Sequence, residues 1–512
     1  MAIKISGTTV IDNSRNGTNL GIVTATSFVG DGSALTNLPP SGGTMTATAS
    51  GSISNGAPVI IQNDGKVKSV AGCALTASGS SLVTFESGET DSYMTSVYDT
   101  ANQKIVIFYI DGDDSDKGKA VVGTVSGDSI SFGTPVVFSS GTNNDNFGQA
   151  AYDAASGKIV IGYRESTSAA KCRVGTVSGT SISFGTATSF RTDSTQNIYV
   201  GNAGDNKVIV AYDAASNGRA KIGTISGTSI SFGTEAVFHA SDSHEKVIIY
   251  DTDILSPVIY YRQNNSYGAY SVAKIDGTTI TFNSQGYINS TNQVRNISGA
   301  YDPVAKKHLV FGNYTISSTQ KAALRVIHIN GSTESTAVNL PTDVLEIDTN
   351  VPQKTSTTYN PDTGKFILVS YESTTQAIRI YEGKIDQATF VADSGSTTLT
   401  RPNGYVPTVY DTAAKRAVVA FSDYSGDAGK ASVYSSEFTP NLANFIGFSD
   451  AAYTDGNTAT IQILSSTDDA QSGLTTASKH YLQGDGTLST TPDSPSVVAG
   501  TALSGTEIII KR

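Results

Sequence analysis

The chain has no tryptophan, only two cysteines and few charged residues, and each shortage excludes a class of protein. Cys73 and Cys172 lie far apart without CxxC spacing, so the sequence indicates neither a disulfide framework nor a zinc site. Charged residues make up 15% of the chain, too few for a disordered protein, and no apolar run is long enough for a membrane-spanning helix. The N-terminus also lacks the apolar segment of a secretion signal. We therefore expect a soluble globular protein with two buried thiols.

The net charge and the abundant small residues further restrict the class of protein that we expect. Lysine and arginine number 34 against 45 aspartates and glutamates, a net charge of −11 without any basic cluster. Nucleic-acid binding is therefore not expected, because it needs a concentrated positive surface. The chain has 50 glycines and is rich in serine, threonine, valine and isoleucine, a mixture that favours short strands and tight turns. An all-β fold is predicted.

An internal repeat is visible without any alignment. The pattern Gly-Thr-Val/Ile-Ser-Gly-x-Ser-Ile-Ser-Phe-Gly-Thr occurs at 123–134, 175–186 and 223–234, with a weaker copy at 274–282. Ahead of each copy stands a second motif, a Tyr-Asp turn followed by an apolar strand such as Lys-Ile-Val-Ile-Phe-Tyr at 104–109. This turn motif occurs at Tyr98-Asp99, Tyr152-Asp153, Tyr250-Asp251, Tyr301-Asp302, Tyr359-Asn360 and Tyr410-Asp411.

The spacing of these turns gives the number of repeats. The interval between the second and third turns is twice the others, and residues 200–207 fill the gap as a variant turn ahead of the apolar strand 208–212. The chain therefore carries seven repeats of about fifty residues, numbered 1 to 7 below. Each supplies four short strands, which fits a propeller blade. A solenoid is the competing architecture, but seven is a natural number for a closed ring.

We accordingly predict an all-β protein whose residues 71–440 form a seven-bladed β-propeller. The first and last strands of this region should share one blade and so close the ring. Residues 44–70 and 441–512 both contain a strand, an Asp-Gly turn and a second strand, and we expect them to form one small split β domain around the propeller. Residues 1–43 have too few apolar side chains for a core of their own, which indicates an attachment or trimerisation segment.

Both ends of the chain resemble known phage proteins. Residues 1–15, MAIKISGTTVIDNSR, and 21–39, GIVTATSFVGDGSALTNLP, resemble the start of tail-fibre and tail-adhesin proteins of marine phages, cyanophages among them. Residues 473–490, GLTTASKHYLQGDGTLST, and 499–506, AGTALSGT, are similar to a module at the distal end of many such proteins. The Tyr-Asp and Gly-Thr-Val-Ser-Gly repeats also resemble repeats of phage fibres and of large marine bacterial surface proteins.

This resemblance implies a virion protein of the phage tail, homotrimeric, whose N-terminus binds other tail or baseplate proteins. Its function would be adsorption, with the propeller as a receptor-binding adhesin for a host surface glycan or outer-membrane component. The resemblance leaves open whether the protein belongs to the fibre, the baseplate or a head decoration. Two other functions also stay open: a propeller glycosidase or depolymerase, and a decoration or connector protein without a ligand.

Loop lengths indicate where a receptor would bind. In an antiparallel meander, the second and fourth connections of each repeat lie at one end of the strands, and here these are the ones that vary in length and content. Their aromatic, amide and arginine side chains suit the rings and hydroxyls of glycans. The candidate receptor-binding residues are Asn143, Asn144, Asp145, Phe147, Arg164, Arg191, Gln196, Tyr199, Arg262, Asn264, Tyr267, Arg295, Asn313, Tyr314, Arg401, Asn403, Tyr405 and Tyr424.

Catalytic and metal-binding patterns are weak. The five histidines show no HExxH spacing, GxSxG is absent, and the Asp box of propeller sialidases would need a tryptophan. Two glycosidase carboxylates need no motif, so a hydrolase stays an alternative. The acidic loop 111–116 alternates oxygen ligands as a calcium loop does, but no glutamate stands twelve residues after Asp111. We predict no catalytic residue, no metal and no cofactor, and we assign the repeated aspartates to turns, where their side chains accept backbone N–H groups.

Overall fold

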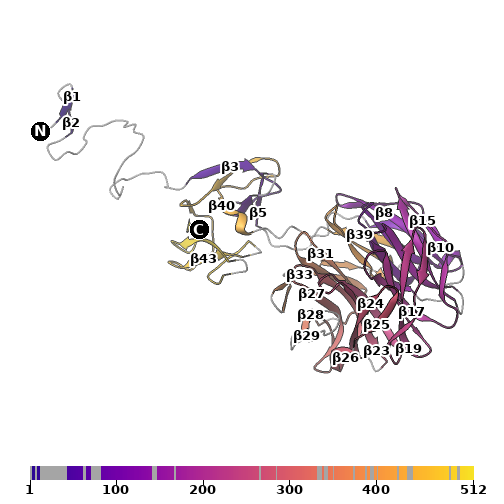
Figure 1. Cartoon of the computed structure of the whole chain (residues 1–512). Helices are drawn as coiled ribbons and strands as arrows, with labels where there is room; N and C mark the ends of the chain where they lie inside the picture. The colour runs from indigo at the N-terminus through magenta and orange to yellow at the C-terminus, as the bar shows by residue number, and fades with distance from the viewer. Residues whose placement is uncertain are drawn as a thin grey trace. The chain divides into compact units, whose positions relative to one another are not determined.

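The computed structural model describes residues 3–5, 8–11, 43–61, 65–70, 82–140, 147–165, 169–264, 267–283, 285–330, 337–339, 344–349, 351–372, 375–386, 389–392, 397–400, 402–423, 426–434, 442–483, 486–492 and 496–511, some by backbone alone. Over these residues the regular structure is almost entirely β (Figure 1). Two short 3₁₀ helices, η1 (Gly112–Asp114) and η2 (Leu442–Asn444), are the helical elements in that part of the chain. The all-β prediction is therefore confirmed.

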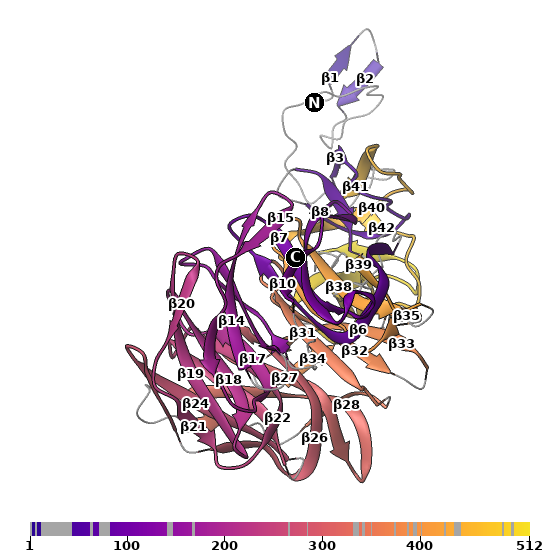
Figure 2. The same ribbon diagram turned by 90° about the vertical axis from the view of Figure 1, so that its right-hand side faces the viewer.

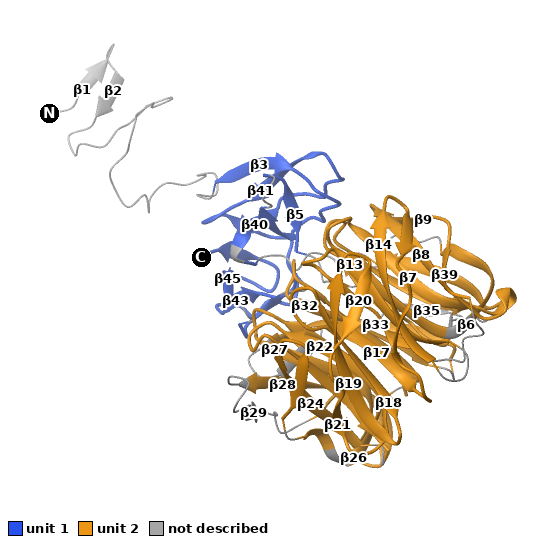
Figure 3. Ribbon diagram, turned by 45° about the vertical axis from the view of Figure 1, so that its right-hand side comes forward, with its two compact units in different colours: residues 1–70, 441–512 blue, residues 71–440 orange. Residues whose placement is uncertain are grey.

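The chain divides into two compact units (Figure 3). Unit 1 comprises residues 1–70 and 441–512, and unit 2 comprises residues 71–440. One sheet of unit 1 has the order β3-β41-β40-β4-β5, so it joins strands from both segments. Its strands are β3 (Thr44–Thr48), β41 (Thr458–Gln462), β40 (Phe445–Ser449), β4 (Pro58–Ile61) and β5 (Val67–Ser69).

A second sheet of unit 1, in the order β42-β46-β45-β43-β44, packs its apolar side chains with those of the first around Phe448, Leu482 and Ile508. Its strands are β42 (Thr467–Asp468), β46 (Ile508–Ile510), β45 (Val497–Ala502), β43 (Lys479–Leu482) and β44 (Leu488–Ser489). Strands β1 (Ile3–Ile5) and β2 (Thr8–Ile11) form a hairpin near the N-terminus.

Unit 2 consists of mostly antiparallel sheets that follow the sequence repeats. Repeat 1 supplies β6 (Val83–Asp99), β7 (Lys104–Asp111), β8 (Lys117–Ser126), β9 (Ser129–Phe132) and β10 (Val136–Ser139). Repeat 2 supplies β11 (Phe147–Gln149), β12 (Ala151–Asp153), β13 (Lys158–Glu165), β14 (Ala169–Ser178), β15 (Ser181–Phe184) and β16 (Thr188–Arg191). Repeat 3 supplies β17 (Gln196–Asn202), β18 (Lys207–Ala214), β19 (Asn217–Ser226), β20 (Ser229–Phe232) and β21 (Ala236–His239).

The later repeats follow the same plan. Repeats 4 and 5 supply β22 (Ser243–Asp251), β23 (Ser256–Gln263), β24 (Tyr267–Asp276), β25 (Thr279–Phe282), β26 (Gly286–Asp302), β27 (Lys307–Ile316), β28 (Thr319–Asn330), β29 (Ala337–Asn339) and β30 (Leu345–Asp348). Repeats 6 and 7 supply β31 (Lys354–Asn360), β32 (Lys365–Glu372), β33 (Ala377–Asp386), β34 (Thr389–Ala392), β35 (Thr397–Thr400), β36 (Pro402–Asn403), β37 (Thr408–Asp411), β38 (Arg416–Asp423) and β39 (Ala428–Tyr434).

The second strand of each repeat is buried on both faces. In β7, seven consecutive residues after Lys104 are buried, and β18 and β38 show the same pattern. A near-continuous apolar run is what a strand needs when other layers cover both of its faces. The side chains of β7 accordingly divide between two core clusters, with Val106 and Phe108 in one and Ile105 and Ile107 in the other.

The first and last strands of the repeat region pair, as expected. The N-terminal half of β6 is antiparallel to β39, with Val83 opposite Ala431 and Glu86 opposite Gly429, while its C-terminal half pairs with β7. β6, β39 and β38 lie side by side in Figure 2. Strands from the two ends of unit 2, more than 300 residues apart, therefore belong to one sheet.

The outer strand of several repeats is interrupted, which the repeat pattern did not indicate. β9 and β10 both pair with β8, and β15 and β16 both pair with β14. A glycine stands just after the first piece in each case. A Cβ on Gly133 would lie 1.8 Å from the carbonyl oxygen of Thr180, in the hairpin turn of the next repeat, and one on Gly185 would lie 1.9 Å from that of Thr228. The repeated glycine thus lets neighbouring repeats come into contact.

The Tyr-Asp turns have the structure that their sequence indicates. Asp99 is fully buried, and its Oδ1 accepts the backbone N–H groups of Ala101 and Asn102, each at 3.0 Å. The same arrangement of one oxygen and two N–H groups recurs at Asp251, Asp302, Asn360 and Asp411. The turn role predicted for these aspartates is confirmed.

In four of the repeats, the hydroxyl of the turn tyrosine forms a hydrogen bond with the turn of the preceding repeat. Tyr359 donates to Asp302 Oδ1 at 3.0 Å, and Tyr410 donates to Asp362 Oδ2 at 3.0 Å. Tyr152 accepts from the Ala101 backbone N–H at 3.2 Å, and Tyr98 accepts from the Ala413 N–H at 3.3 Å. The last contact joins repeat 1 to repeat 7. The side chain of Asn202 takes this place in repeat 3, donating to the Tyr152 carbonyl at 3.4 Å.

Candidate functional site

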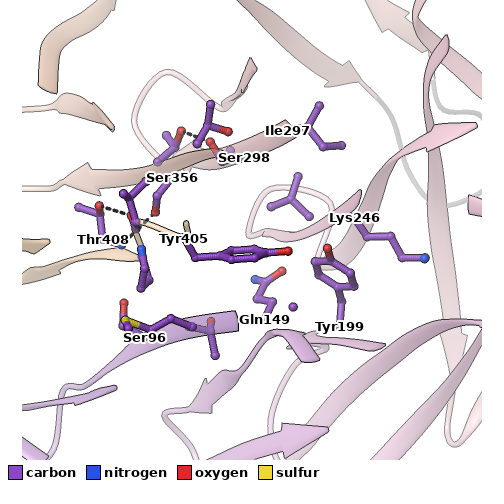
Figure 4. Close-up of a pocket in the computed structure, with 18 residues that line it drawn as sticks. Ser96, Gln149, Tyr199, Lys246, Ile297, Ser298, Ser356, Tyr405 and Thr408 are labelled. Carbon is purple, nitrogen blue, oxygen red and sulfur yellow. Dashed lines mark hydrogen bonds between the residues drawn. The ribbon is translucent and has the colours of Figure 1, made fainter. Parts of the chain in front are cut away.

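The inner strands of unit 2 converge on one pocket of about 180 Å³ (Figure 4). All seven repeats contribute to its wall. The lining residues are Met94, Thr95, Ser96, Gly148, Gln149, Tyr199, Lys246, Val247, Ile297, Ser298, Gly299, Thr355, Ser356, Thr357, Tyr405, Val406, Pro407 and Thr408. Residues far apart in the sequence therefore share a single cavity.

These lining residues occupy equivalent places in their repeats. They lie about three to five positions ahead of the turn aspartate or asparagine. Four positions ahead of the turn residue stand Thr95, Gln149, Val247, Ser298, Ser356 and Pro407, before Asp99, Asp153, Asp251, Asp302, Asn360 and Asp411 respectively. Whereas the turn residue is nearly constant, the pocket position is threonine, glutamine, valine, serine or proline. The pocket wall is therefore assembled from the part of the inner strand that the repeat leaves free to vary.

Aromatic and amide side chains meet inside the pocket. Figure 4 shows Tyr405 and Tyr199 directed toward one another from opposite sides, with Gln149 beside them. Gln149 bridges to repeat 4, because its Nε2 donates to the Ile248 carbonyl at 3.1 Å and its Oε1 accepts the Ile248 N–H at 3.0 Å. Burial raises the pKa of Tyr199 well above its ordinary value, so this hydroxyl stays protonated at neutral pH and can donate a hydrogen bond.

Hydroxyl groups line the other side of the cavity. Ser298 and Thr357 share a hydrogen bond at 2.8 Å, and Ser356 Oγ accepts the Thr408 backbone N–H at 2.9 Å, so neighbouring repeats are linked at the wall. Ser96 Oγ, by contrast, is buried and has no hydrogen-bond partner. A buried hydroxyl without a partner is costly and is a group that a polar ligand could satisfy.

Three cationic side chains lie in or near the pocket, and two of them are neutralised. Lys246 Nζ is 3.0 Å from Asp213 Oδ2, and Figure 4 shows its side chain pointing out of the cavity. Arg262 Nε is 3.4 Å from Glu245 Oε2. Lys354 lies instead with its Nζ 4.0 Å from the centre of the Tyr405 ring, a cation–π contact. Burial lowers the pKa of Lys354, only partly offset by the negative charge of Glu245.

The structure brings together only some of the predicted receptor-binding residues. Tyr199 and Tyr405 both line the pocket. Arg262, Asn264 and Tyr267 lie at the β23–β24 hairpin, with Asn264 exposed. Gln196 and Arg295 are also exposed, near the starts of the inner strands of repeats 3 and 5.

Two predicted arginines have structural partners. Arg164 donates to the Thr195 carbonyl at 3.4 Å. Arg191 forms ion pairs with Asp193 and Glu235, each at 2.6 Å. Both guanidinium groups therefore already have an acceptor within unit 2.

Three predicted residues are core residues, and for them the prediction is wrong. Phe147 packs its ring against Phe138, and Tyr314 is fully buried and donates to the Val310 carbonyl at 3.0 Å. Asn313 is 4% exposed and donates to the Pro352 carbonyl at 3.4 Å. They were assigned to loops, but β11 and β27 extend through them, so their side chains point into the protein. Asn143, Asn144, Asp145, Arg401 and Tyr424, and the side chain of Asn403, lie outside the described residues.

Most of the pocket was missed because the prediction considered only loops. Thr95, Gln149, Lys246 and Ser356 lie within strands, where the sequence gives no hint of exposure. A usable signal was nevertheless present. Aligning the repeats on the turn residue shows that the positions four to six residues earlier vary in chemical character, which is unexpected for a strand needed only for packing.

Neither a metal cluster nor a membrane span is found within the described ranges. No group of three or more histidine, cysteine, aspartate or glutamate side chains there could hold a metal ion. In the acidic loop that resembled a calcium site, Lys117 lies 2.8 Å from Asp114, and Asp111 is paired with Lys119. No helix among the described elements is long and apolar enough to cross a membrane.

Comparison with known proteins gives limited information. No family model matches the chain, and no curated protein matches it. Among solved structures, Sqt1 from Chaetomium thermophilum is similar at a TM-score of 0.41 and 11% identity, covering 69% of this chain and 99% of that one. A protein from Lactobacillus plantarum is similar at a TM-score of 0.44 and 9% identity, covering 72% and 98%.

Proposed function

We propose that unit 2 is a seven-bladed β-propeller and that its central pocket binds a receptor. Seven sequence repeats each supply an inner strand to one pocket. The strand pair β6–β39 and the contact of Tyr98 with Ala413 link repeat 1 back to repeat 7. A solenoid would leave its first and last repeats apart, whereas these contacts favour a ring.

The biological role that we propose is that of a phage tail adhesin for a host surface glycan. The resemblance of both chain ends to tail-fibre proteins supports the virion location and the trimer. The observation that carries the binding function is the pocket wall, where equivalent strand positions carry threonine, glutamine, valine, serine or proline in different repeats. A purely architectural ring would have no reason to vary these positions while keeping its turns alike.

The chemistry of the pocket favours a sugar as the ligand. Its wall mixes tyrosine rings with serine and threonine hydroxyls and one glutamine amide, the groups that bind the faces and hydroxyls of pyranoses. Its volume of about 180 Å³ is below the range of drug-sized sites, roughly 300–1,000 Å³, and suits a single sugar unit. One such contact is weak, but three copies on one trimer would raise the overall affinity through effective concentration.

The test is competition for adsorption. The purified full-length protein is added to susceptible cells before the phage, and the fraction of phage that still adsorbs is measured. We expect the protein to block adsorption and Tyr199→Ala to lose the block. Tyr287→Ala is the matched control, because this exposed tyrosine lies outside the pocket lining.

The alternatives give different results. A folded protein that never blocks adsorption, on cells whose receptor density is limiting, would contradict the adhesin role and favour a decoration or connector. Release of reducing sugars from host polysaccharide would point to a depolymerase. Blocking retained in a folded Tyr199→Ala variant would place the receptor site outside the pocket.

A further inference from the structure

The charges around the pocket do not balance. Lys246 is paired with Asp213 and Arg262 with Glu245, so each of these cations has its own carboxylate. Lys354 has none: within the part of unit 2 that the structure describes, no carboxylate oxygen lies within ion-pair distance of its Nζ. Among these three cations, Lys354 is therefore the one without a carboxylate of its own.

The location of this charge is well defined. Lys354 begins β31, and the next residue, Thr355, lines the pocket. Its ammonium lies over the ring of Tyr405, which also lines the pocket and packs against Tyr93 with ring centres 5.3 Å apart. Tyr405 thus holds the amine next to the cavity, within reach of a group that enters beside the ring.

Burial makes this positive charge energetically unfavourable. The Lys354 side chain is only partly exposed, and removing an ammonium from water is unfavourable unless an anionic partner compensates for the lost hydration. The nearby Glu245 offers limited compensation, because its Oε2 accepts the Asn296 N–H at 2.5 Å and faces Arg262. An anionic ligand would supply the missing partner, and Ser96 Oγ adds a free hydrogen-bonding group in the same cavity.

We propose that the pocket selects an anionic pyranose, whose acidic group binds the ammonium of Lys354 while its hydroxyls bind Ser96 and the other polar groups of the wall. This inference rests on the proposed glycan-binding function and specifies the class of sugar. A uronic acid and a sulfated hexose share the chemistry that it requires. Neutral sugars leave the ammonium unpaired and therefore bind more weakly.

The experiment measures binding to matched sugar pairs. Full-length protein is titrated with methyl glycosides of glucuronic, galacturonic and mannuronic acid, with the 6-sulfates of the same three hexoses, and with the neutral parents. We expect at least one acidic sugar to bind roughly tenfold more tightly than its neutral parent at low salt, and this ratio to fall as salt rises. Carboxylates and sulfates are separate arms, so the result identifies which acid is preferred.

Variants assign the preference to Lys354. Lys354→Gln should reduce the acidic-to-neutral ratio to about one, and Lys354→Arg should keep the ratio high because the charge is retained. Lys306→Gln is the control, since it removes the same charge from an exposed lysine paired with Asp253, outside the pocket lining. Far-UV circular dichroism establishes that each variant is folded.

Every outcome decides between the two proposals. Equal binding of acidic and neutral sugars, or an acidic preference that survives in Lys354→Gln, overturns the anionic-sugar proposal and leaves glycan binding intact. If no sugar binds but the protein still blocks phage adsorption, the anionic-sugar proposal is wrong and the adhesin role stands. If neither effect is seen, both are wrong.

Discussion

The two ends of each inner strand in unit 2 follow opposite rules. At the turn end, Asp or Asn accepts two backbone N–H groups in repeat after repeat, and a tyrosine contacts the preceding repeat. At the pocket end, about four residues earlier, the side chain is threonine in one repeat, glutamine in the next and serine or valine in others. The turn end therefore carries similar residues in most repeats, whereas the pocket end carries several different residue types.

We assign the turn end of each inner strand to the contacts between repeats, and the pocket end to the proposed ligand binding. Contacts between repeats must be made the same way at every junction, so the residues that form them recur with the repeat. In the proposed function the pocket holds one ligand, and each position on its wall faces a different part of that ligand. The strongest test of this division is to alter each kind of position and to measure stability and binding separately.

The largest effect on stability is expected at a repeated glycine. Gly185→Val would place side-chain atoms where Thr228 O lies 1.9 Å from an ideal Cβ, so the hairpin turn of the next repeat must move. We expect a loss of about 3 kcal/mol in unfolding free energy, as for an overpacked site, with sugar binding retained in the folded fraction. Urea denaturation measures it. Gly426→Val, where nothing lies within 4 Å, is the control, and similar losses in both variants would contradict the packing explanation.

A turn aspartate comes next. Asp302→Ala removes the acceptor for the Val304 and Ala305 N–H groups and for the Tyr359 hydroxyl. Because the exposed turn can regain some hydrogen bonds from water, we expect a loss of about 2 kcal/mol rather than the full sum. Asp302→Asn is the matched control, since Asn360 performs the same role in repeat 6. Loss of binding with stability unchanged would mean that Asp302 belongs to a functional site.

A smaller effect is expected from acid, through the buried pair of His308 and Asp251. His308 Nε2 lies 2.8 Å from Asp251 Oδ2, and the rings of Tyr260 and Tyr301 pack against the imidazole. Burial lowers the pKa of His308, outweighing the opposing effect of Asp251, while the nearby His328 lowers it further. Below about pH 6.5 the imidazole of His308 therefore binds a proton in the unfolded chain, whereas in the folded protein it does so only at a lower pH.

Stability should accordingly be constant above that pH and fall below it, by at most about 1.4 kcal/mol per pH unit for this one group. Melting temperatures between pH 8 and pH 5 measure the slope. His308→Gln, which can still hydrogen-bond to Asp251 but does not titrate, should flatten it. An unchanged slope in this variant would assign the acid sensitivity to another group, such as His239, whose pKa burial also lowers.

The smallest effect on stability is expected at the pocket end. Ser96→Ala removes a buried hydroxyl that has no partner, so the unfolding free energy should change by less than about 0.5 kcal/mol. Binding of the preferred sugar should nevertheless weaken severalfold, because the ligand loses a hydrogen bond. Titration and denaturation of the same preparation compare the two effects. A clear loss of stability with intact binding would mean that Ser96 stabilises the fold and does not bind the sugar. That result would contradict the assignment of the pocket end of the strand to binding.

Local sequence signals predicted the strands and turns well. The apolar run at 104–109 predicted a strand, and β7 spans these residues. The Tyr-Asp pairs predicted side-chain caps of tight turns, which the buried Asp99 confirms. These signals are reliable because period, burial and turn chemistry are properties of a few adjacent residues.

Predictions that depended on where a segment lies in space were less reliable. Tyr314 was assigned to a loop although β27 continues through it, because nothing local marks the point at which a buried strand ends. The break in the outer strand at Gly133 depends on a carbonyl oxygen of the next repeat, about fifty residues away.

The sequence by itself determined the β class, the number of repeats and the residues that cap each turn. The reason is that the residues of a single repeat, and its recurrence along the chain, specify each of these. Only the tertiary structure decided which side chains share a cavity and which charge stays unpaired. Tyr199, Lys354 and Tyr405 are separated by about 50 to 200 positions, and their proximity results from the convergence of seven strands. A pocket built from one short stretch of every repeat has no local pattern to reveal it.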